Sequence, residues 1–247
     1  MIEAGLWGAL GASALLLGAI IAFLANVPKR VQGLILAFGA GTLIGAVAYE
    51  LFEEAVQLSV AGVDVAIGFG LGALVFYLGS LAIDRMSGET AEGRDAIASR
   101  RDPRTSGLAL VLGAVLDGVP ESVVLGLSLL GGEGVGIAVL AAVFISNVPE
   151  GLSASEDLAS AGLARMRIIG LWLLVVAVSA FASAFGFGVL GKMGPDVVVL
   201  LDSFAAGAIL AMLSESMIPE AYEEGGRAVG LATTFGFAIA AALSFNT

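Results

Sequence analysis

The chain has 247 residues, of which 58% are hydrophobic and only 13% are charged, with a mean hydropathy of +1.00. Soluble domains carry about 25% charged residues, so this composition excludes a soluble enzyme, a secreted disulfide scaffold and a disordered tail. The absence of Cys and His excludes a Cys/His zinc site and a Ser-His nucleophile pair, while a net charge of −11 argues against a nucleic-acid partner.

Long apolar runs fill almost the whole chain. At about 20 residues per membrane span, the length allows seven or eight transmembrane helices and leaves nothing for a soluble domain. We therefore expect an all-α, polytopic membrane protein with a single transmembrane domain over residues 1–247. The eight predicted spans are Ala4–Asn26, Gly33–Gln57, Val63–Ile83, Ser106–Leu130, Val135–Leu158, Arg165–Gly191, Asp196–Tyr222 and Arg227–Phe245.

The basic residues predict the orientation of the chain. Ten of the eleven follow spans 1, 3, 5 and 7, and only Lys192 falls on the other side. Lys and Arg concentrate on the cytoplasmic side of membranes, so both termini are expected to be extracytoplasmic in the cell (inner) membrane. The polar segment 84–105 contains five Arg and is predicted to be a mobile cytoplasmic loop. The excess of Arg over Lys favours a prokaryotic source.

Spans 2 and 7 share a pattern at a constant offset of 166 residues. The matched pairs are Phe38 with Phe204, Gly41 with Gly207, Glu54 with Glu220 and Ala55 with Ala221. The two spans run in opposite directions, so the match predicts an inverted repeat of spans 1–3 and 6–8 around spans 4 and 5. This 3+2+3 arrangement is typical of transporters.

Span 4 carries two carboxylates in an apolar helix. Asp117 and Glu121 are four residues apart and therefore share one helix face. A carboxylate at this depth costs about 2.5–3.5 kcal/mol on insertion scales, and no Lys or Arg lies mid-span to compensate it. Protonation, water or a bound cation remains as the compensating partner.

Span 5 repeats this spacing with Ser146 and Glu150, and Asn147 lies beside them. Both motifs contain Val-Pro-Glu, and each proline leaves the carbonyl four residues earlier without its helical donor. The five side chains Asp117, Glu121, Ser146, Asn147 and Glu150 together offer an oxygen-only site for a divalent cation. The alternative is a pair of proline kinks with neutral, hydrogen-bonded carboxylic acids.

Other acidic residues are weaker candidates for an entrance, an exit or a second metal site. Solvated helix ends are the simpler interpretation for most of them. They are Glu50, Glu54, Glu215, Glu220, Glu156, Asp157 and Asp202.

At these motifs the sequence resembles the ZIP (Zrt/Irt-like) family of divalent metal transporters. Family members typically show His-Asn-x-Pro-Glu-Gly in the fourth span, where this chain reads Asp117-Gly118-Val119-Pro120-Glu121-Ser122. In the fifth span they show His-Glu-x-Pro-His/Glu-x-Gly or similar, where this chain reads Ser146-Asn147-Val148-Pro149-Glu150-Gly151. The resemblance covers nearly the whole chain and implies eight spans with both termini outside.

The resemblance places Asp117, Glu121, Ser146 and Glu150 at the family's metal-ligand positions. Gly118 and Asn147 fall where many members place ligands of an adjoining second metal, and a glycine side chain cannot bind one. The sixth span also lacks the acid that two-metal members use, so we expect one metal site. Because every usual His is replaced, the site is expected to accept zinc without preferring it, alongside manganese, iron or cadmium.

We therefore expect a divalent metal ion transporter working by alternating access, with the metal ion as substrate and no fixed cofactor. The expected partners are divalent metal ions and the lipid bilayer, and a homodimer is left open. A cation-coupled carrier of a small solute is the main alternative. An intramembrane aspartyl hydrolase would need Asp117 and Asp202 as a pair, and we do not expect an enzyme.

Overall fold

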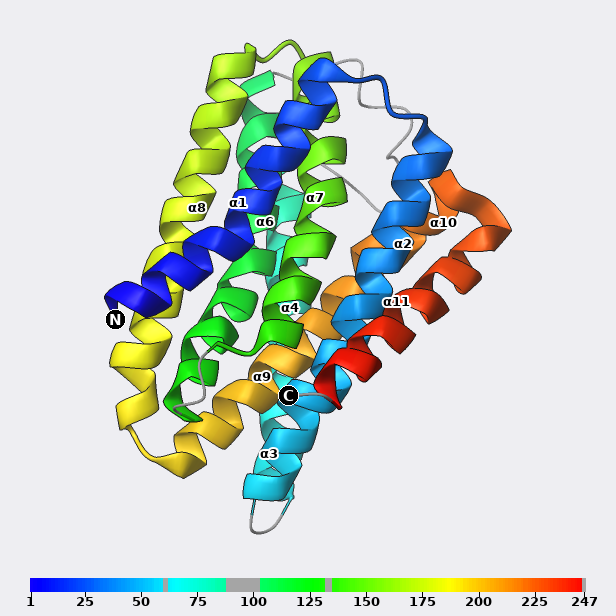
Figure 1. The fold of residues 1–247 in the computed structure, drawn as a ribbon. Helices are drawn as coiled ribbons and strands as arrows, with labels where there is room; N and C mark the ends of the chain where they lie inside the picture. Colours follow the sequence, from blue (N-terminus) through cyan, green and yellow to red (C-terminus); the bar gives the residue numbers. More distant parts are fainter. Residues whose placement is uncertain (60–61, 88–102, 132–134, 246–247) are drawn as a thin grey trace.

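The computed structural model describes residues 1–59, 62–87, 103–131 and 135–245, and these ranges contain helices and no strand (Figure 1). The α-helices are α1 (Ile2–Leu24), α2 (Lys29–Ala46), α3 (Glu53–Leu58), α4 (Val63–Ser87), α6 (Pro103–Leu127), α7 (Ile137–Ser160), α8 (Arg165–Gly188), α9 (Pro195–Met212), α10 (Ile218–Gly225) and α11 (Val229–Ser244). Two π-helical turns, η1 (Val47–Phe52) and η5 (Leu213–Met217), continue α2 and α9. Three 3₁₀ turns are η3 (Ser128–Gly131), η4 (Leu190–Lys192) and η6 (Gly226–Ala228). The prediction of an all-helical chain is confirmed for the described residues.

Seven helices among the described residues are long and apolar enough to cross a membrane, which makes the chain a multi-pass membrane protein in character. The last of them, Asp196–Ser244, has 49 residues and includes α9, α10 and α11. Within it Gly226 has a φ of 67°, which side-chain-bearing residues rarely adopt. The chain turns back at this glycine between α10 and α11 (Figure 1).

The helices also border the predicted loop 84–105. Helix α4 continues to Ser87 and α6 begins at Pro103, so both ends of the predicted loop are helical. A helix can continue beyond its last apolar residue because backbone hydrogen bonds define its end, and hydropathy alone does not predict that end. Residues 88–102, where the mobile loop is predicted, lie outside the described residues.

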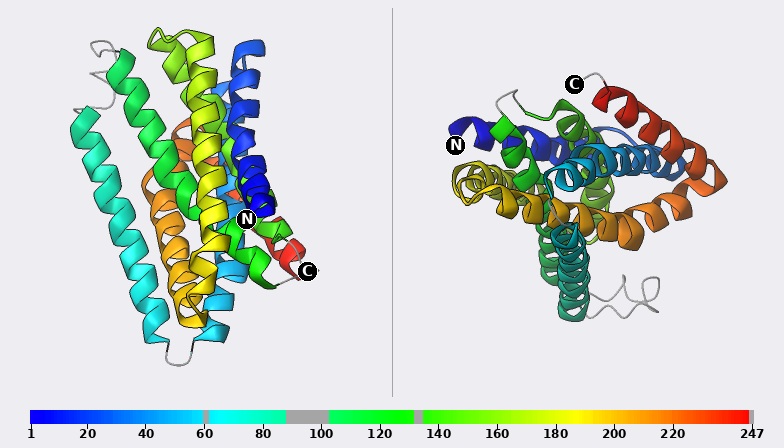
Figure 2. Two further views of the ribbon diagram at one scale, coloured as in Figure 1. Left: turned by 90° about the vertical axis from the view of Figure 1, so that its left-hand side faces the viewer. Right: turned by 90° about the horizontal axis from the view of Figure 1, so that it is seen from below.

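The long helices pack as two bundles. In the first, which we call the α1 bundle, α1 packs along α7 and α8, and α6 packs along α8. In the second, the α2 bundle, α2 packs along α10 and α11, and α4 packs along α9. The bundles meet where α2 contacts α7 and where α6 contacts α4 and α9. Helix α4 lies at the edge of the molecule (Figure 2).

Glycines let the backbones of paired helices in the α2 bundle approach closely. A Cβ added at any of four glycines would overlap a backbone carbonyl oxygen of the neighbouring helix, so only glycine fits. The four contacts are Gly41 on Thr233, Gly236 on Phe38, Gly207 on Phe69 and Gly72 on Phe204. Thus α2 packs on α11 in the same way as α9 packs on α4.

These contacts repeat with a regular spacing along the sequence. Gly41 and Gly207 are 166 residues apart, as are their counterparts Phe38 and Phe204. The π-helical turns η1 and η5 begin at Val47 and Leu213, and 213 − 47 is again 166. The sequence offset that relates spans 2 and 7 therefore also relates their packing contacts and their helical irregularities.

Candidate metal centre

A cavity of about 580 Å³ lies where the two bundles meet. Its walls come from α2, α4, α6, α7, α8, α9, η5 and α10. It extends from Ser146, near the middle of α7, to Ser160 and Ala161 at the end of that helix. At 1.5 Å per residue, the stretch from Ser146 to Ser160 corresponds to about 21 Å of helix. The cavity therefore joins the middle of the molecule to one end of it.

Three carboxyls line this cavity, and none of them has a basic partner in the part of the chain that the structure describes. Asp117, Glu121 and Glu150 all line it, and Asp117 and Glu121 both act electrostatically on Glu150. The ion pairs within the described part of the chain all involve Lys29, which lies outside this cavity. Glu121 is only 2% exposed. Uncompensated negative charge is costly at such a position, so either protonation or a bound cation would compensate it.

The two polar residues of the α7 motif point in different directions. Ser146 lines the cavity and donates its hydroxyl to the Val143 carbonyl at 3.0 Å, which leaves its oxygen lone pairs for another partner. Asn147 does not line the cavity, because adjacent residues on a helix are rotated by about 100°. Its amide donates instead to the Gly11 carbonyl of α1 at 3.3 Å. Four of the five predicted site residues are therefore brought together.

The weaker candidates are divided between different parts of the molecule. Glu215, Glu220 and Asp157 line the large cavity. Glu50 and Asp202 line a separate pocket of about 90 Å³. Because Asp117 and Asp202 line different pockets, they do not form the pair that an aspartyl hydrolase would need. Glu156 lies in an ion pair with Lys29 at 3.3 Å, and the side chain of Glu54 lies outside the described part of the structure.

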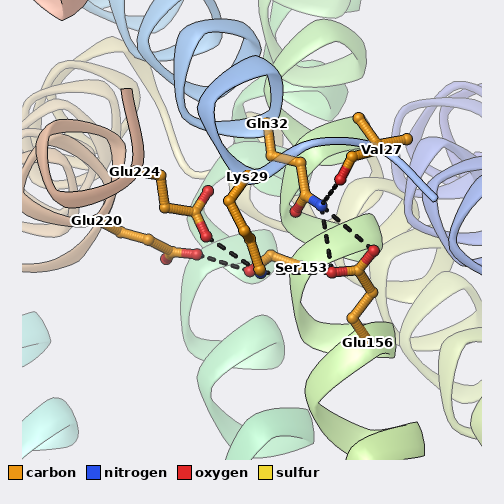
Figure 3. Close-up of polar contacts among 7 residues, drawn as sticks. All are labelled: Val27, Lys29, Gln32, Ser153, Glu156, Glu220 and Glu224. Carbon is orange, nitrogen blue, oxygen red and sulfur yellow. Dashed lines mark hydrogen bonds and ion pairs between the residues drawn. The ribbon is translucent and has the colours of Figure 1, made fainter. Parts of the chain in front are cut away.

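The cavity wall that α7 provides extends beyond the Val-Pro-Glu motif. Ser153 and Asp157 line the cavity beyond Ser146 and Glu150, toward the C-terminal end of α7. The spacing of these four residues, at i, i+4, i+7 and i+11, is that of one helix face. Ser153 also donates its hydroxyl to Glu220 at 2.7 Å (Figure 3). Asp157 was among the weaker candidates from the sequence, whereas Ser153 was missed, and following the helical period beyond the motif would have found it.

The carboxyls surround an open space rather than a finished coordination shell. No group of three acidic, His or Cys side chains in the described ranges lies close enough together to hold a metal ion. Full coordination of an ion by these side chains would therefore require the helices around the cavity to move closer together. One buried apolar cluster borders both pockets: its Leu43 lines the large cavity, and its Leu51, Val124 and Val139 line the small pocket.

Cysteine labelling tests whether water fills the cavity, because the chain has no native Cys. Ser214 and Ser216 are both exposed, but Ser216 lines the cavity and Ser214 does not, so in a membrane-spanning helix Ser214 would contact lipid. In membrane vesicles a charged maleimide is expected to label Ser216→Cys at least about tenfold faster than Ser214→Cys, because a thiol in water ionises and reacts more readily. Mass spectrometry over time gives the rates, and equal rates would contradict a water-filled cavity.

The arrangement is that of a helical membrane-type protein with an acidic cavity between two bundles. No protein-family model matches the sequence. The chain is 28% identical over 218 residues to an Arabidopsis thaliana protein whose name describes it as a proposed zinc transporter. The match covers 84% of this chain and 33% of that protein, so the chain spans about a third of the length of this relative. The relative is named as a transporter and not as an enzyme.

Proposed function

We propose that the chain is a divalent metal ion transporter of the ZIP type. The observation that carries this proposal is the cavity between the two bundles, which Asp117, Glu121 and Glu150 line with no basic partner among the described residues. The name of the Arabidopsis relative, which concerns zinc transport by that protein, supports the same class. The motif resemblance in α6 and α7 supports it independently.

The proposed topology has eight spans, with Asp196–Ser244 counted as two because the chain turns at Gly226. The shared offset of the π-turns and glycine contacts supports an inverted repeat with a 3+2+3 arrangement. In Figure 1 the start of α1 and the end of α11 lie below the α1–α2 and α7–α8 turns, which are at the upper end. Lys29 and Arg165 begin the helices after those turns, which favours a cytoplasmic upper end and extracytoplasmic termini.

The proposed metal ligands are the carboxylates of Asp117, Glu121 and Glu150 and the hydroxyl oxygen of Ser146. All are oxygen donors, which suit manganese and other hard ions and are also accepted by zinc. Asn147 is proposed to support the site from outside the ligand shell, because it bonds to α1 in this conformation. Zinc, manganese, iron(II) and cadmium are the proposed cargo ions.

Transport is proposed to occur by alternating access between the two bundles. The α1 bundle carries the proposed ligands on α6 and α7, and the α2 bundle provides the opposite wall. In this conformation the large cavity reaches the end of α7, which is the proposed cytoplasmic end. The apolar cluster around Leu43 and Val124 separates it from the small pocket at Glu50. Movement of one bundle against the other would move the barrier to the opposite side of the ion.

Reconstitution in liposomes tests this function. Vesicles that contain a trapped metal-sensitive dye are expected to take up Mn²⁺, Zn²⁺, Fe²⁺ or Cd²⁺ down its gradient, without Na⁺ or ATP. Competition among the four ions gives their order of preference. Absence of flux for all four ions in correctly folded protein would overturn the proposal. Na⁺- or H⁺-driven uptake of an organic solute would support a cation-coupled carrier instead.

A further inference from the structure

A second group of charged residues lies beside the cavity, where α2, α7 and α10 meet. The Lys29 ammonium is 3.3 Å from the Glu156 carboxylate and 3.1 Å from the Glu224 carboxylate. The two carboxylates come from different bundles, since Glu156 lies on α7 and Glu224 on α10. Figure 3 shows Glu156, Glu224 and Gln32 grouped around the Lys29 side chain. One ammonium therefore compensates two carboxylates.

Gln32 holds one of these carboxylates in place. Its side chain is 2% exposed, and its amide nitrogen donates to the Val27 carbonyl at 2.8 Å and to both carboxylate oxygens of Glu156 at 3.2 Å. These bonds fix the orientation of the amide, because only its nitrogen can donate. Glu156 is thus positioned by a buried neighbour even when Lys29 moves.

Two oxygens in this group are buried and accept no hydrogen bond. They are the carbonyl oxygen Oε1 of Gln32 and the Oε2 oxygen of Glu224. The group therefore has more oxygen acceptors than Lys29 satisfies. Each buried acceptor without a donor costs about 1–3 kcal/mol. Hard divalent cations bind six or more oxygens, including carboxylate and amide oxygens. The unfilled acceptors therefore suit a metal ion better than an ammonium.

The Lys29 ammonium is free to move away from the two carboxylates that it contacts. Its side chain is 54% exposed, compared with 26% for Glu156 and 16% for Glu224. The long aliphatic stem lets the ammonium move into water while the carboxylates stay in place. A divalent cation that reaches this group would therefore meet oxygens already in place, and among the described residues it would compete with the flexible Lys29 ammonium.

The group also adjoins the route into the large cavity. Glu220 and Asp157 line that cavity, and Lys29 acts electrostatically on both. We propose that Glu156, Glu224 and the Gln32 carbonyl form a second divalent-cation site, which Lys29 fills as a tethered cation until a metal ion displaces it. This inference rests on the proposed function, because it takes the transported ion as the ligand.

Mn²⁺ binding tests the site without measuring transport. The background is the triple variant Asp117→Asn, Glu121→Gln, Glu150→Gln, which removes the charges of the central site. In this background Lys29→Met is expected to increase the affinity for Mn²⁺ at least about tenfold, because it removes a positive charge from the site. The loss of the free Mn²⁺ signal in electron paramagnetic resonance measures the binding.

Matched variants distinguish the site from a general effect of charge. Arg30→Met removes the same charge one residue away and is expected to leave the affinity within about twofold, because screened surface charges act weakly at a distance. Adding Glu156→Gln and Glu224→Gln to Lys29→Met is expected to abolish the gain. Lys29→Arg keeps the charge and reports on folding, and it is expected to bind Mn²⁺ as weakly as the background.

Two results would overturn the proposal. One is an unchanged Mn²⁺ affinity in folded Lys29→Met protein, and the other is a gain that survives loss of both glutamates. Neither result bears on transport by the wild-type chain. Conversely, wild-type protein that fails to transport metal would refute the proposed function while leaving this binding measurement interpretable.

Discussion

Replacing Glu150 by glutamine is expected to reduce metal transport at least about a hundredfold, equivalent to about 3 kcal/mol. Glu150 lines the cavity and is acted on electrostatically by Asp117, Glu121 and Glu220. Glutamine keeps the size of the side chain and one acceptor oxygen, but it removes the charge that a divalent cation requires. Initial rates of metal uptake into liposomes, at equal amounts of reconstituted protein, measure the loss.

The same substitution is expected to leave the fold intact or to stabilise it. A carboxylate among apolar helices costs about 2.5–3.5 kcal/mol, and a neutral amide relieves part of this cost. The melting temperature in detergent should therefore stay the same or rise while transport falls. Glu223→Gln is the control, because Glu223 is exposed and lines neither pocket. Normal transport by Glu150→Gln would refute its assignment as a ligand.

Replacing Gly72 by alanine is expected to destabilise the protein by about 2–3 kcal/mol, as overpacking of a close contact does. A Cβ at Gly72 would overlap the carbonyl oxygen of Phe204, which belongs to the backbone of α9 and cannot rotate away. Helices α4 and α9 would have to separate along their contact. Thermal unfolding in detergent, followed by size-exclusion chromatography, measures the change.

Gly70 provides a control on the same helix. A Cβ at Gly70 would meet no atom within 4 Å, so Gly70→Ala is expected to be neutral or to stabilise by up to about 1 kcal/mol. Equal effects of the two substitutions would show that helix propensity, and not the close approach of α4 and α9, determines the result.

The sequence alone predicts the elements whose pattern is local. Asp117 and Glu121 share a cavity wall because a spacing of four residues places them on one helix face, and Ser146 and Glu150 follow the same rule. Their role as metal ligands stays a prediction. Asn147 was grouped with them from adjacency in the sequence, whereas the helix turns its side chain toward α1.

Features that depend on tertiary contacts were not predictable in this way. Lys29 was used only to orient the chain, and its pairing with Glu156 joins residues 127 positions apart. The π-turn at Val47 was not predictable from composition, because one extra residue per turn requires no particular residue type. Gly41 and Gly207 were read as a repeated motif, and only the folded chain shows which carbonyls they contact.

The two π-turns have opposite surroundings, although they occupy corresponding places in the sequence. η1 contributes Glu50 to the small pocket, and η5 contributes Glu215 and Ser216 to the large cavity. Glu50 corresponds to Ser216 at the offset of 166 residues, so an exchange of conformations between the two halves would place Glu50 at the large cavity and Ser216 at the small pocket. Under the proposed alternating access, the asymmetry between the halves would therefore also describe the second state of the transporter.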